Sequence, residues 1–261
     1  MRITRLANNL RVIALLLNSY DIDLIIATHN RLRNSIASGN ETNRGFPSAG
    51  NMLVLEWDDE LAAVAQAHAS QCLFQHDCYQ CRRTERYATV GQNIFLYRTS
   101  RLSVRNRWQY AIQWQYAIQL WYDELSIAPN SIVSQFEASS LNIGHFTQVV
   151  WADTQKVGCG YVSYAVPNSM YKVAQLYTCN YAPGGNYIGL QTYRIGAPAS
   201  ECPHMSRPSH HYKALCKVYQ KTRFVESKRV ANERKAKIKG EIYCWVELVG
   251  LEAVVALVVW M

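Results

Sequence analysis

The sequence lacks the motifs that mark the common catalytic and nucleotide-binding sites. It contains no GxSxG nucleophile elbow, no P-loop, no HExxH helix and no dinucleotide-binding glycine fingerprint. It also lacks a long apolar run, because the apolar C-terminal end covers only Ala253–Met261 and a helix needs about 20 residues to cross a bilayer. No specific nucleic-acid motif is present. We therefore expect neither a transmembrane segment nor a nucleic-acid partner.

The first 20 residues supply only part of a signal peptide. Arg2, Arg5 and Arg11 precede the apolar run Val12–Leu17, which is short for a signal sequence and has no clear small-residue cleavage site. Residues 1–21 are therefore expected to be a degenerate or wrongly assigned signal region. The formal net charge of +8 indicates a mildly basic protein whose charges lie on a solvated surface.

The eight cysteines are the most informative part of the composition. Cys78 and Cys81 form one CxxC, but no second pair stands at zinc-ribbon spacing, and no strand precedes the motif as in thioredoxin-like proteins. Oxidised pairing is the better interpretation, and it indicates an extracellular protein, since cytosolic thiols stay reduced. The eight positions are Cys72, Cys78, Cys81, Cys159, Cys179, Cys202, Cys216 and Cys244.

Two helices are predicted in the first third of the chain. From Asp23 to Ser38, the residues Ile25, His29, Leu32 and Ile36 share one helical face. A second helix should begin after Asp58, whose side chain can accept hydrogen bonds from the free amides of the first turn. We expect its buried face to consist of Leu61, Val64, Ala65, His68 and Cys72. His29 and His68 are therefore predicted to be core residues.

A third helical region, Val104–Leu125, contains a perfect tandem repeat. The hexapeptide WQYAIQ at Trp108–Gln113 recurs at Trp114–Gln119. At about 100° per residue, six residues rotate the second copy by about 240° net, so the two copies cannot face the same core. Either one copy is absorbed in a bulge or looped out, or the helix is simply lengthened.

A hairpin is predicted after Gln148. The runs Val157–Val166 and Tyr171–Ala182 are rich in Val, Tyr and Thr and flank the turn Pro167–Met170. If the hairpin is centred on Ser169, Cys159 and Cys179 stand directly opposite each other, at a separation that suits a disulfide. Cys202 and Cys216, which close a short segment, are the second expected pair.

Two segments go beyond composition, namely GHFTQVVWADTQKVGCGY at Gly144–Tyr161 and YTCNYAPGGNYIG at Tyr177–Gly189. They resemble the signature motifs of the CAP superfamily, which comprises cysteine-rich secretory, antigen 5 and pathogenesis-related class 1 proteins with an SCP domain. The VGQNIF run at Val90–Phe95 and the context of Cys81 resemble the antigen 5 members of venoms and saliva. Further matches are HNRLR at His29–Arg33, WDDELA at Trp57–Ala62, AHASQCLFQHD at Ala67–Asp77 and LWYDEL at Leu120–Leu125.

The resemblance implies an α+β fold, a three-layer α/β/α sandwich with a central antiparallel sheet. It places the CAP domain at residues 22–195, followed by a short cysteine-containing extension at 196–217. Residues 218–261 are basic and weakly periodic and share no hydrophobic face with what precedes them, so they are expected to form a separate tail. Antigen 5 members carry N-terminal cysteines that bridge to the positions of Cys72 and Cys81, and this chain has no cysteine before Cys72. Some of the cysteines at 72, 78 and 81 should therefore pair differently or stay free.

The family's central cleft, carried over by motif, consists of His76, Gln92, Glu124 and His145. Gln92 stands where many members have Glu, and a glutamine can neither act as a general base nor supply a charged metal ligand. Two imidazoles and one carboxylate can bind Zn²⁺ with an open position, so His76, His145 and Glu124 are the expected ligand set of a Zn²⁺ site at this cleft. Taken alone, His76 beside Asp77 would fit a surface ion pair, and His145 would fit a buried residue that donates to a carbonyl.

These observations predict a secreted, extracellular and monomeric CAP protein of the antigen 5 type. We expect it to be a non-catalytic binding or signalling module for a lipid, a sterol or an extracellular protein target, which requires no cofactor. The alternative is a metal-assisted hydrolase, either a protease or an esterase, in which Glu124 acts as base and the two histidines serve as ligands or proton carriers.

Overall fold

The computed structural model describes residues 2–5, 11–14, 17–100, 107–137 and 142–219. For residues 2–5, 11–14 and 107–112, only the backbone is described. Most of the expected tail, from residue 220 onward and including Cys244, lies outside the described residues, and so does the apolar C-terminal end. The prediction of a degenerate signal region at 1–21 stays a prediction.

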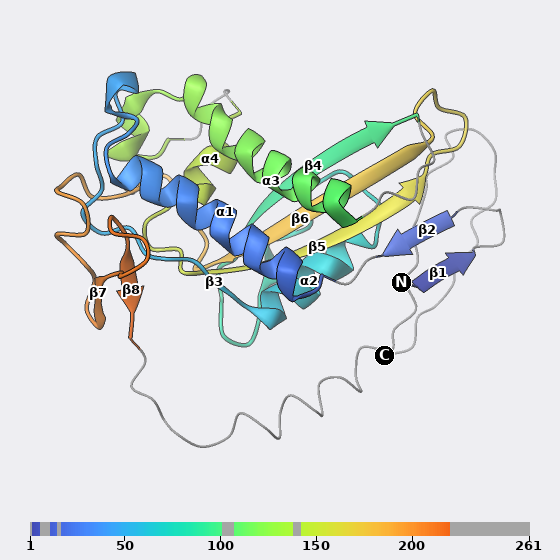
Figure 1. The fold of residues 1–261 in the computed structure, drawn as a ribbon, viewed down its shortest axis with the longest axis horizontal. Coiled ribbons are helices and arrows are strands. Elements are labelled where there is room, and N and C mark those ends of the chain that lie inside the picture. Colours follow the sequence, from blue (N-terminus) through green and yellow to red (C-terminus); the bar gives the residue numbers. More distant parts are fainter. Residues whose placement is uncertain (1, 6–10, 15–16, 101–106, 138–141, 220–261) are drawn as a thin grey trace, which may run out of the picture.

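The fold is a sheet with helices on both faces (Figure 1). The strand order is β1-β2-β5-β6-β4, and β3 pairs with the first residues of β5. This last pairing is parallel, in a sheet whose other pairings are antiparallel. The strands are β1 (Arg2–Arg5), β2 (Arg11–Ala14), β3 (Glu56–Trp57), β4 (Gly91–Thr99), β5 (Lys156–Ala165) and β6 (Val173–Ala182).

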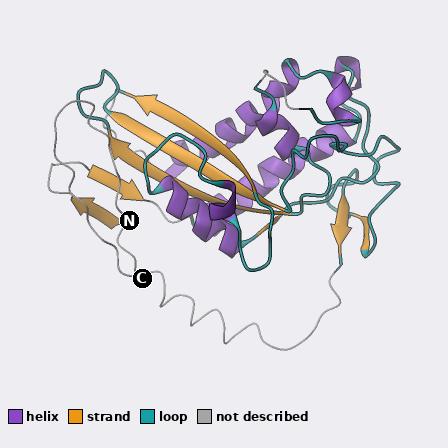
Figure 2. Ribbon diagram, turned by 180° about the vertical axis from the view of Figure 1, so that it is seen from behind, coloured by secondary structure: helices purple, strands orange, loops and turns teal. Residues whose placement is uncertain are grey.

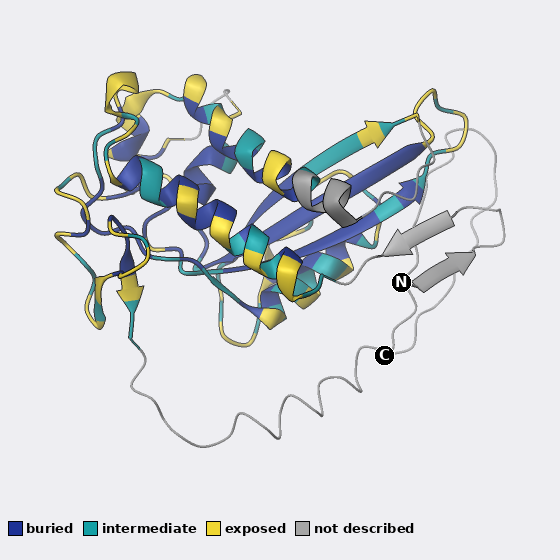
Figure 3. Cartoon of the chain, in the orientation of Figure 1, coloured by how far each residue is buried: buried dark blue, intermediate teal, exposed yellow. Residues whose placement is uncertain are grey.

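The helices complete a three-layer α+β sandwich, as expected. One face of the sheet is covered by α1 (Ser19–Ala37), α3 (Arg107–Asp123) and α4 (Gly144–Val149), whereas α2 (Asp59–Ala69) covers the other (Figure 2). The buried residues gather along the central strands and the inward sides of the helices (Figure 3). The short elements are η1 (Thr42–Arg44), η2 (Tyr79–Arg82), η3 (Glu124–Ser126), η4 (Asn130–Val133), β7 (Ser206–Pro208) and β8 (Cys216–Val218).

Helix α1 carries the predicted apolar face but begins four residues earlier than predicted. Asn18 caps it, accepting from the backbone of Asp21 while the Asp21 carboxylate accepts from the backbone of Asn18. These two hydrogen bonds satisfy backbone amides at the start of the helix. The spacing of apolar residues gives no information about such a cap, so it did not predict the earlier start. Ile25, His29 and Ile36 are all fully buried, which confirms the predicted face.

Helix α2 lies unusually close to the sheet because β5 has two glycines beneath it. A β-carbon at Gly158 would lie 2.2 Å from the backbone nitrogen of Ala62, and one at Gly160 would lie 2.4 Å from Gln66. Side chains alternate across a strand, so the intervening Cys159 points to the opposite face. The helix starts after Asp58, whose side chain accepts from the amides of residues 60 and 61, as predicted.

The tandem repeat lies within one uninterrupted helix, α3. The lengthened helix is therefore the alternative that is realised, and neither a bulge nor a looped-out copy is present. In the second copy Trp114 and Ile118 are fully buried, whereas Tyr116 is half exposed. The side chains of the first copy up to residue 112 lie outside the described residues.

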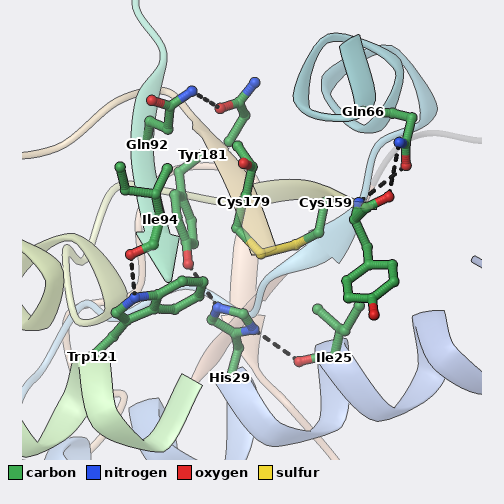
Figure 4. Close-up of a disulfide and its surroundings, with 12 residues drawn as sticks. Ile25, His29, Gln66, Gln92, Ile94, Trp121, Cys159, Cys179 and Tyr181 are labelled. Carbon is green, nitrogen blue, oxygen red and sulfur yellow. Dashed lines mark hydrogen bonds between the residues drawn. A yellow bond between two sulfur atoms is a disulfide. The ribbon is translucent and has the colours of Figure 1, made fainter. Parts of the chain in front are cut away.

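The predicted hairpin is formed by β5 and β6 in the expected register. Cys159 stands directly opposite Cys179, and the two are joined in a buried disulfide (Figure 4). The second predicted pair, Cys202–Cys216, is also formed. Cys78 and Cys81 are joined to each other, and Cys72 is disulfide-bonded as well.

A fully buried arginine joins α1 to the loops at one end of the sheet. The guanidinium of Arg33 donates to five backbone carbonyls. Burial lowers the pKa of Arg33 to about 9, so the group keeps its charge at neutral pH. The five acceptors belong to Leu53, Val149, Trp151, Ala152 and Thr154.

Candidate functional site

The four residues carried over by motif come together from four separate elements. His76 lies on the loop after α2, Gln92 on β4, Glu124 at the start of η3 and His145 on α4. The structure pairs His76 with Gln92 and His145 with Glu124. The two imidazole rings face each other with 6.4 Å between their centroids, so the two pairs form one group, called here the histidine site.

Glu124 holds His145 and the start of α4 through three hydrogen bonds. One carboxylate oxygen accepts from His145 Nδ1 at 2.6 Å. The other accepts from the backbone amides of His145 and Phe146, both at 3.0 Å. Because a carboxylate only accepts, the proton of the neutral ring must sit on Nδ1, which leaves a lone pair on Nε2. Glu124 thus orients both the ring of His145 and the first turn of α4.

Gln92 orients His76 in a similar way but without a charge. Its amide nitrogen donates to Asn180 on the neighbouring strand β6 at 3.2 Å, the bond drawn at Gln92 in Figure 4. This contact leaves the amide oxygen to His76 Nδ1, at 2.9 Å. His76 Nδ1 is therefore the donor in this pair, and its Nε2 carries the lone pair. Partial burial lowers the pKa of His76, and the positive charge of Arg82 acts in the same direction, against the hydrogen bond to Gln92.

Two side chains that were not identified from the sequence complete the support of His145. Trp121 stacks on its ring at 6.3 Å between centroids and donates from its own ring nitrogen to the carbonyl of Ile94. Asn93 donates to the backbone carbonyl of His145 at 3.1 Å. Asn93 adjoins Gln92 in the VGQNIF run, and Trp121 lies in the LWYDEL run. The matching motifs therefore already included both supporting residues.

The expected three-residue metal set is not assembled in this structure. Both oxygens of Glu124 are occupied by His145 and by backbone amides, so this carboxylate supports a ligand rather than acting as one. Among the described residues, no group of three or more His, Cys, Asp and Glu is placed to hold a metal ion. What remains is a pair of imidazoles whose Nε2 atoms have no hydrogen-bond partner in the described part of the chain.

The loop that carries His76 is fixed by further polar contacts. His68 on α2 contacts the carbonyl of Gln75 through Nε2 at 2.9 Å, next to His76. Asp77 forms an ion pair with Arg82 at 2.9 Å and not with His76, so the simple surface ion pair considered for His76 is not formed. His68 is buried and contacts Thr178 through Nδ1, which confirms it as a core residue.

His29 is also confirmed as a core residue. It is fully buried, and its two ring nitrogens contact the carbonyl of Ile25 and the hydroxyl of Tyr181, both at 2.8 Å (Figure 4). Burial lowers the pKa of His29 to about 4, so the ring is neutral at physiological pH. With both nitrogens engaged, His29 offers no atom to a ligand.

Comparison with known proteins agrees with this geometry. Residues 26–181 match the model of the cysteine-rich secretory protein family, CAP. The chain is 40% identical over 194 residues to venom allergen 5 of Tityus serrulatus, covering 74% of this chain and 44% of that protein. It is 36% identical to scoloptoxin SSD976 of Scolopendra dehaani, covering 74% of this chain and 82% of that toxin. Against the first of these relatives, the chain spans less than half of the length.

Solved structures support the same assignment. BmVAL-1 is 26% identical with a TM-score of 0.64, covering 78% of this chain and 97% of its own. NaASP2, whose structure is described as determined with Zn²⁺, is 26% identical with a TM-score of 0.61, covering 77% and 96% of the two chains. The family match, the relatives and the assembled histidine site lead to one conclusion: this chain belongs to the CAP family of cysteine-rich secretory proteins and is venom allergen-like.

Proposed function

We propose that this chain is a secreted, non-catalytic binding module of the antigen 5 type, with a lipid, a sterol or a protein as its target. The commitment of Glu124 carries this proposal. A general base must be able to turn toward a substrate, whereas three hydrogen bonds hold this carboxylate against His145 and the first turn of α4. The second carboxylate of the family pattern is replaced by the amide of Gln92, which cannot take up a proton.

Exposed apolar side chains next to the histidine site support a binding role. Asn186 is hydrogen-bonded to Thr147 and to the carbonyl of Gly144, which ties the segment after it to α4 and hence to His145. In this segment the side chains of Ile188 and Leu190 are 72% and 55% exposed. Together with Tyr187 and Tyr79, which is hydrogen-bonded to Tyr187, they form what we call the apolar rim. Covering such an apolar surface with a ligand removes it from water, which lowers the free energy and favours binding.

Disulfides support an extracellular location. Three of them are formed between described residues, and such bonds persist where the environment is oxidising. None of the helices in the described part of the chain has the length and apolarity that a membrane span requires. The relatives include proteins named as venom allergens and venom toxins.

A Zn²⁺ ion held by His76 and His145 is part of the proposal, as an aid to binding. Each ring has its Nδ1 fixed by a side-chain partner, and this is how proteins orient an imidazole whose Nε2 binds a metal. Two imidazoles leave the other positions of a tetrahedral ion to water or to a target group. When bound, Zn²⁺ would supply a Lewis acid at this point. The related structure named for Zn²⁺ supports the same ion here.

The His145–Glu124 pair favours the second candidate, a hydrolase. A carboxylate that accepts from Nδ1 and leaves Nε2 open is the base–orienter half of a hydrolytic triad. In this version His145 is the proton carrier and Glu124 orients it, in place of the role as base that the sequence suggested. No Ser, Thr or Cys side chain is hydrogen-bonded to His145 in the described part of the chain, which counts against a covalent mechanism.

A binding titration tests the first candidate. The full chain would be titrated with cholesterol and with palmitate, and saturable binding of at least one is expected. The double variant Ile188→Asp with Leu190→Asp should weaken it at least about tenfold, since it places two charges on the apolar rim. Met170→Asp is the matched control, because Met170 is 75% exposed at the far end of the β5–β6 hairpin. Saturable binding of neither lipid would overturn the lipid and sterol version.

Metal analysis and turnover separate the two candidates. The protein would be dialysed against Zn²⁺, and bound zinc measured beside the hydrolysis of a protein substrate and an ester. We expect about one zinc per chain, lost in His145→Ala, without turnover above that of the buffer. Turnover that disappears in both His145→Ala and Glu124→Gln would establish the hydrolase instead. Zinc retained in His145→Ala would contradict the proposed metal site.

A further inference from the structure

The Cys78–Cys81 disulfide differs from the others in its exposure. Both of its cysteines are exposed, on the short helix η2 and directly before it. By contrast, Cys159 and Cys179 are buried in the sheet, and Cys216 is completely covered. An external thiolate can therefore approach the sulfurs of Cys78 and Cys81 without any opening of the fold.

This disulfide does little to hold distant parts of the chain together. Its cysteines are separated by three positions in the sequence, whereas the other two described bridges close separations of 20 and 14. A disulfide stabilises mainly by restricting the unfolded chain, and the effect grows with the length of the closed loop. Breaking the Cys78–Cys81 bond should thus leave the folded structure in place, and a role other than stability can account for the bond.

The surroundings of the bond favour an opening in which the sulfur of Cys78 leaves as the thiolate. The backbone amide of Cys81 donates to the sulfur of Cys78 at 3.0 Å, so negative charge that forms on this sulfur is already hydrogen-bonded. Arg83, two residues after Cys81, is exposed and attracts an anionic thiol to this loop. Arg82 is held by Asp77 and contributes less.

We propose that Cys78–Cys81 is a thiol–disulfide exchange site for low-molecular-weight thiols. The thiolate of the external thiol attacks the sulfur of Cys81, the Cys78–Cys81 bond breaks, and the electron pair leaves on the sulfur of Cys78. A mixed disulfide then joins Cys81 to the external thiol. A second external thiolate attacks the external sulfur of this mixed disulfide and releases the oxidised thiol, leaving two reduced cysteines.

Reduction of the full chain under native conditions tests this assignment, with glutathione as the probe. Thiols would be trapped by alkylation over time and mapped by mass spectrometry. We expect Cys78 and Cys81 to be labelled at least about tenfold faster than Cys202 and Cys216. The circular dichroism of the protein should not change during this phase. Faster labelling of Cys202, or unfolding at the same rate as labelling of Cys78, would overturn the proposal.

Two sets of variants test the direction and the electrostatics of the exchange. In Cys78→Ser the attacking partner within the chain is removed, so oxidised glutathione should leave a stable adduct on Cys81; absence of the adduct would contradict the assignment. Arg83→Glu should slow the reduction of Cys78–Cys81 by about twofold to threefold at low salt, because glutathione is anionic. Arg207→Glu, on strand β7, is the matched control and should leave the rate unchanged.

Discussion

Two regions of this molecule hold the same kinds of residue under opposite conditions. The interior between α1 and the central strands contains a histidine, an arginine and a disulfide, namely His29, Arg33 and Cys159–Cys179. The loop at residues 71–90 contains the same three kinds in exposed positions, namely His76, Arg83 and Cys78–Cys81.

The difference between the two regions lies in what their polar atoms contact. Both nitrogens of His29 are engaged and the guanidinium of Arg33 meets five carbonyls, so neither of these two side chains has a polar atom left for a ligand. In the loop, His76 has its Nε2 available and the disulfide faces solvent. The comparison teaches that residue type alone does not mark a site, whereas an open, oriented atom does.

The largest effect is expected where the interior loses its arginine. Arg33→Met would leave the carbonyls of Leu53, Val149 and Thr154 without a donor, whereas the other two acceptors keep a backbone amide. Each buried unsatisfied group costs about 1–3 kcal/mol. We expect the free energy of unfolding to fall by roughly 3–5 kcal/mol, measured by urea denaturation. Arg83→Met, in the loop, is the control and should change it by less than about 0.5 kcal/mol. If the free energy of unfolding fell equally in the two variants, the buried arginine would be no more important for stability than the exposed one, and the comparison of the two regions would fail.

The two disulfides should also differ in their contributions to stability. Replacing Cys159 and Cys179 together by Ala removes a bridge over a separation of 20 and should cost about 3 kcal/mol. Replacing Cys78 and Cys81 together by Ser should cost at most about 2 kcal/mol, because the closed loop is very short. Thermal and urea unfolding of both double variants would measure the difference. The reverse order of stabilities would contradict our description of the loop bridge as a local bond.

The interior histidine should make stability depend on pH. Since burial lowers the pKa of His29 to about 4, the folded chain favours the neutral ring. The contribution of His29 to the free energy of unfolding is fully present above the pKa of the unfolded chain, about 6.5. It is lost as the pH falls toward 4, and the total loss is about 3 kcal/mol. Urea unfolding at a series of pH values should show the decline, and His29→Gln should reduce it. An unchanged slope in the variant would mean that other groups cause the decline.

The smallest expected effect concerns the open histidine. Gln92→Glu would place a carboxylate beside His76 Nδ1, and a negative charge at this distance favours the protonated ring. We expect the pKa of His76 to rise above its value in the unaltered chain, whereas the pKa of His29 should stay the same. Titration of the histidine ring protons by NMR measures both. A rise at His29 as well would show that the two regions are coupled.

The sequence predicted those parts of the fold that depend on short-range patterns. The equal spacing of Cys159 and Cys179 about Ser169 was sufficient for the register and the bridge of the hairpin, because pairing in a hairpin follows from counting residues. The start of α2 followed from Asp58, whose side chain can serve only the amides directly after it.

Long-range hydrogen bonds could not be predicted from such patterns. The acceptors of Arg33 lie up to 121 positions away in the sequence, and nothing in the helical face marks this arginine as buried. The engagement of Glu124 by the amides of α4 likewise depends on where η3 ends relative to α4. The motifs named the four residues of the histidine site, but only the geometry showed that Glu124 accepts hydrogen bonds from His145 and from the first turn of α4.

The two glycines beneath α2 set a dimension of the histidine site from a distance. With no side chains at Gly158 and Gly160, α2 rests on the backbone of β5. This helix carries His68, which holds the carbonyl of Gln75 and so fixes the height of the next residue, His76, above the sheet. His145, on the opposite layer, has no such dependence on α2. A side chain at either glycine would push α2 away from β5 and carry His76 with it, so the distance between the two imidazoles depends on a strand that holds neither of them.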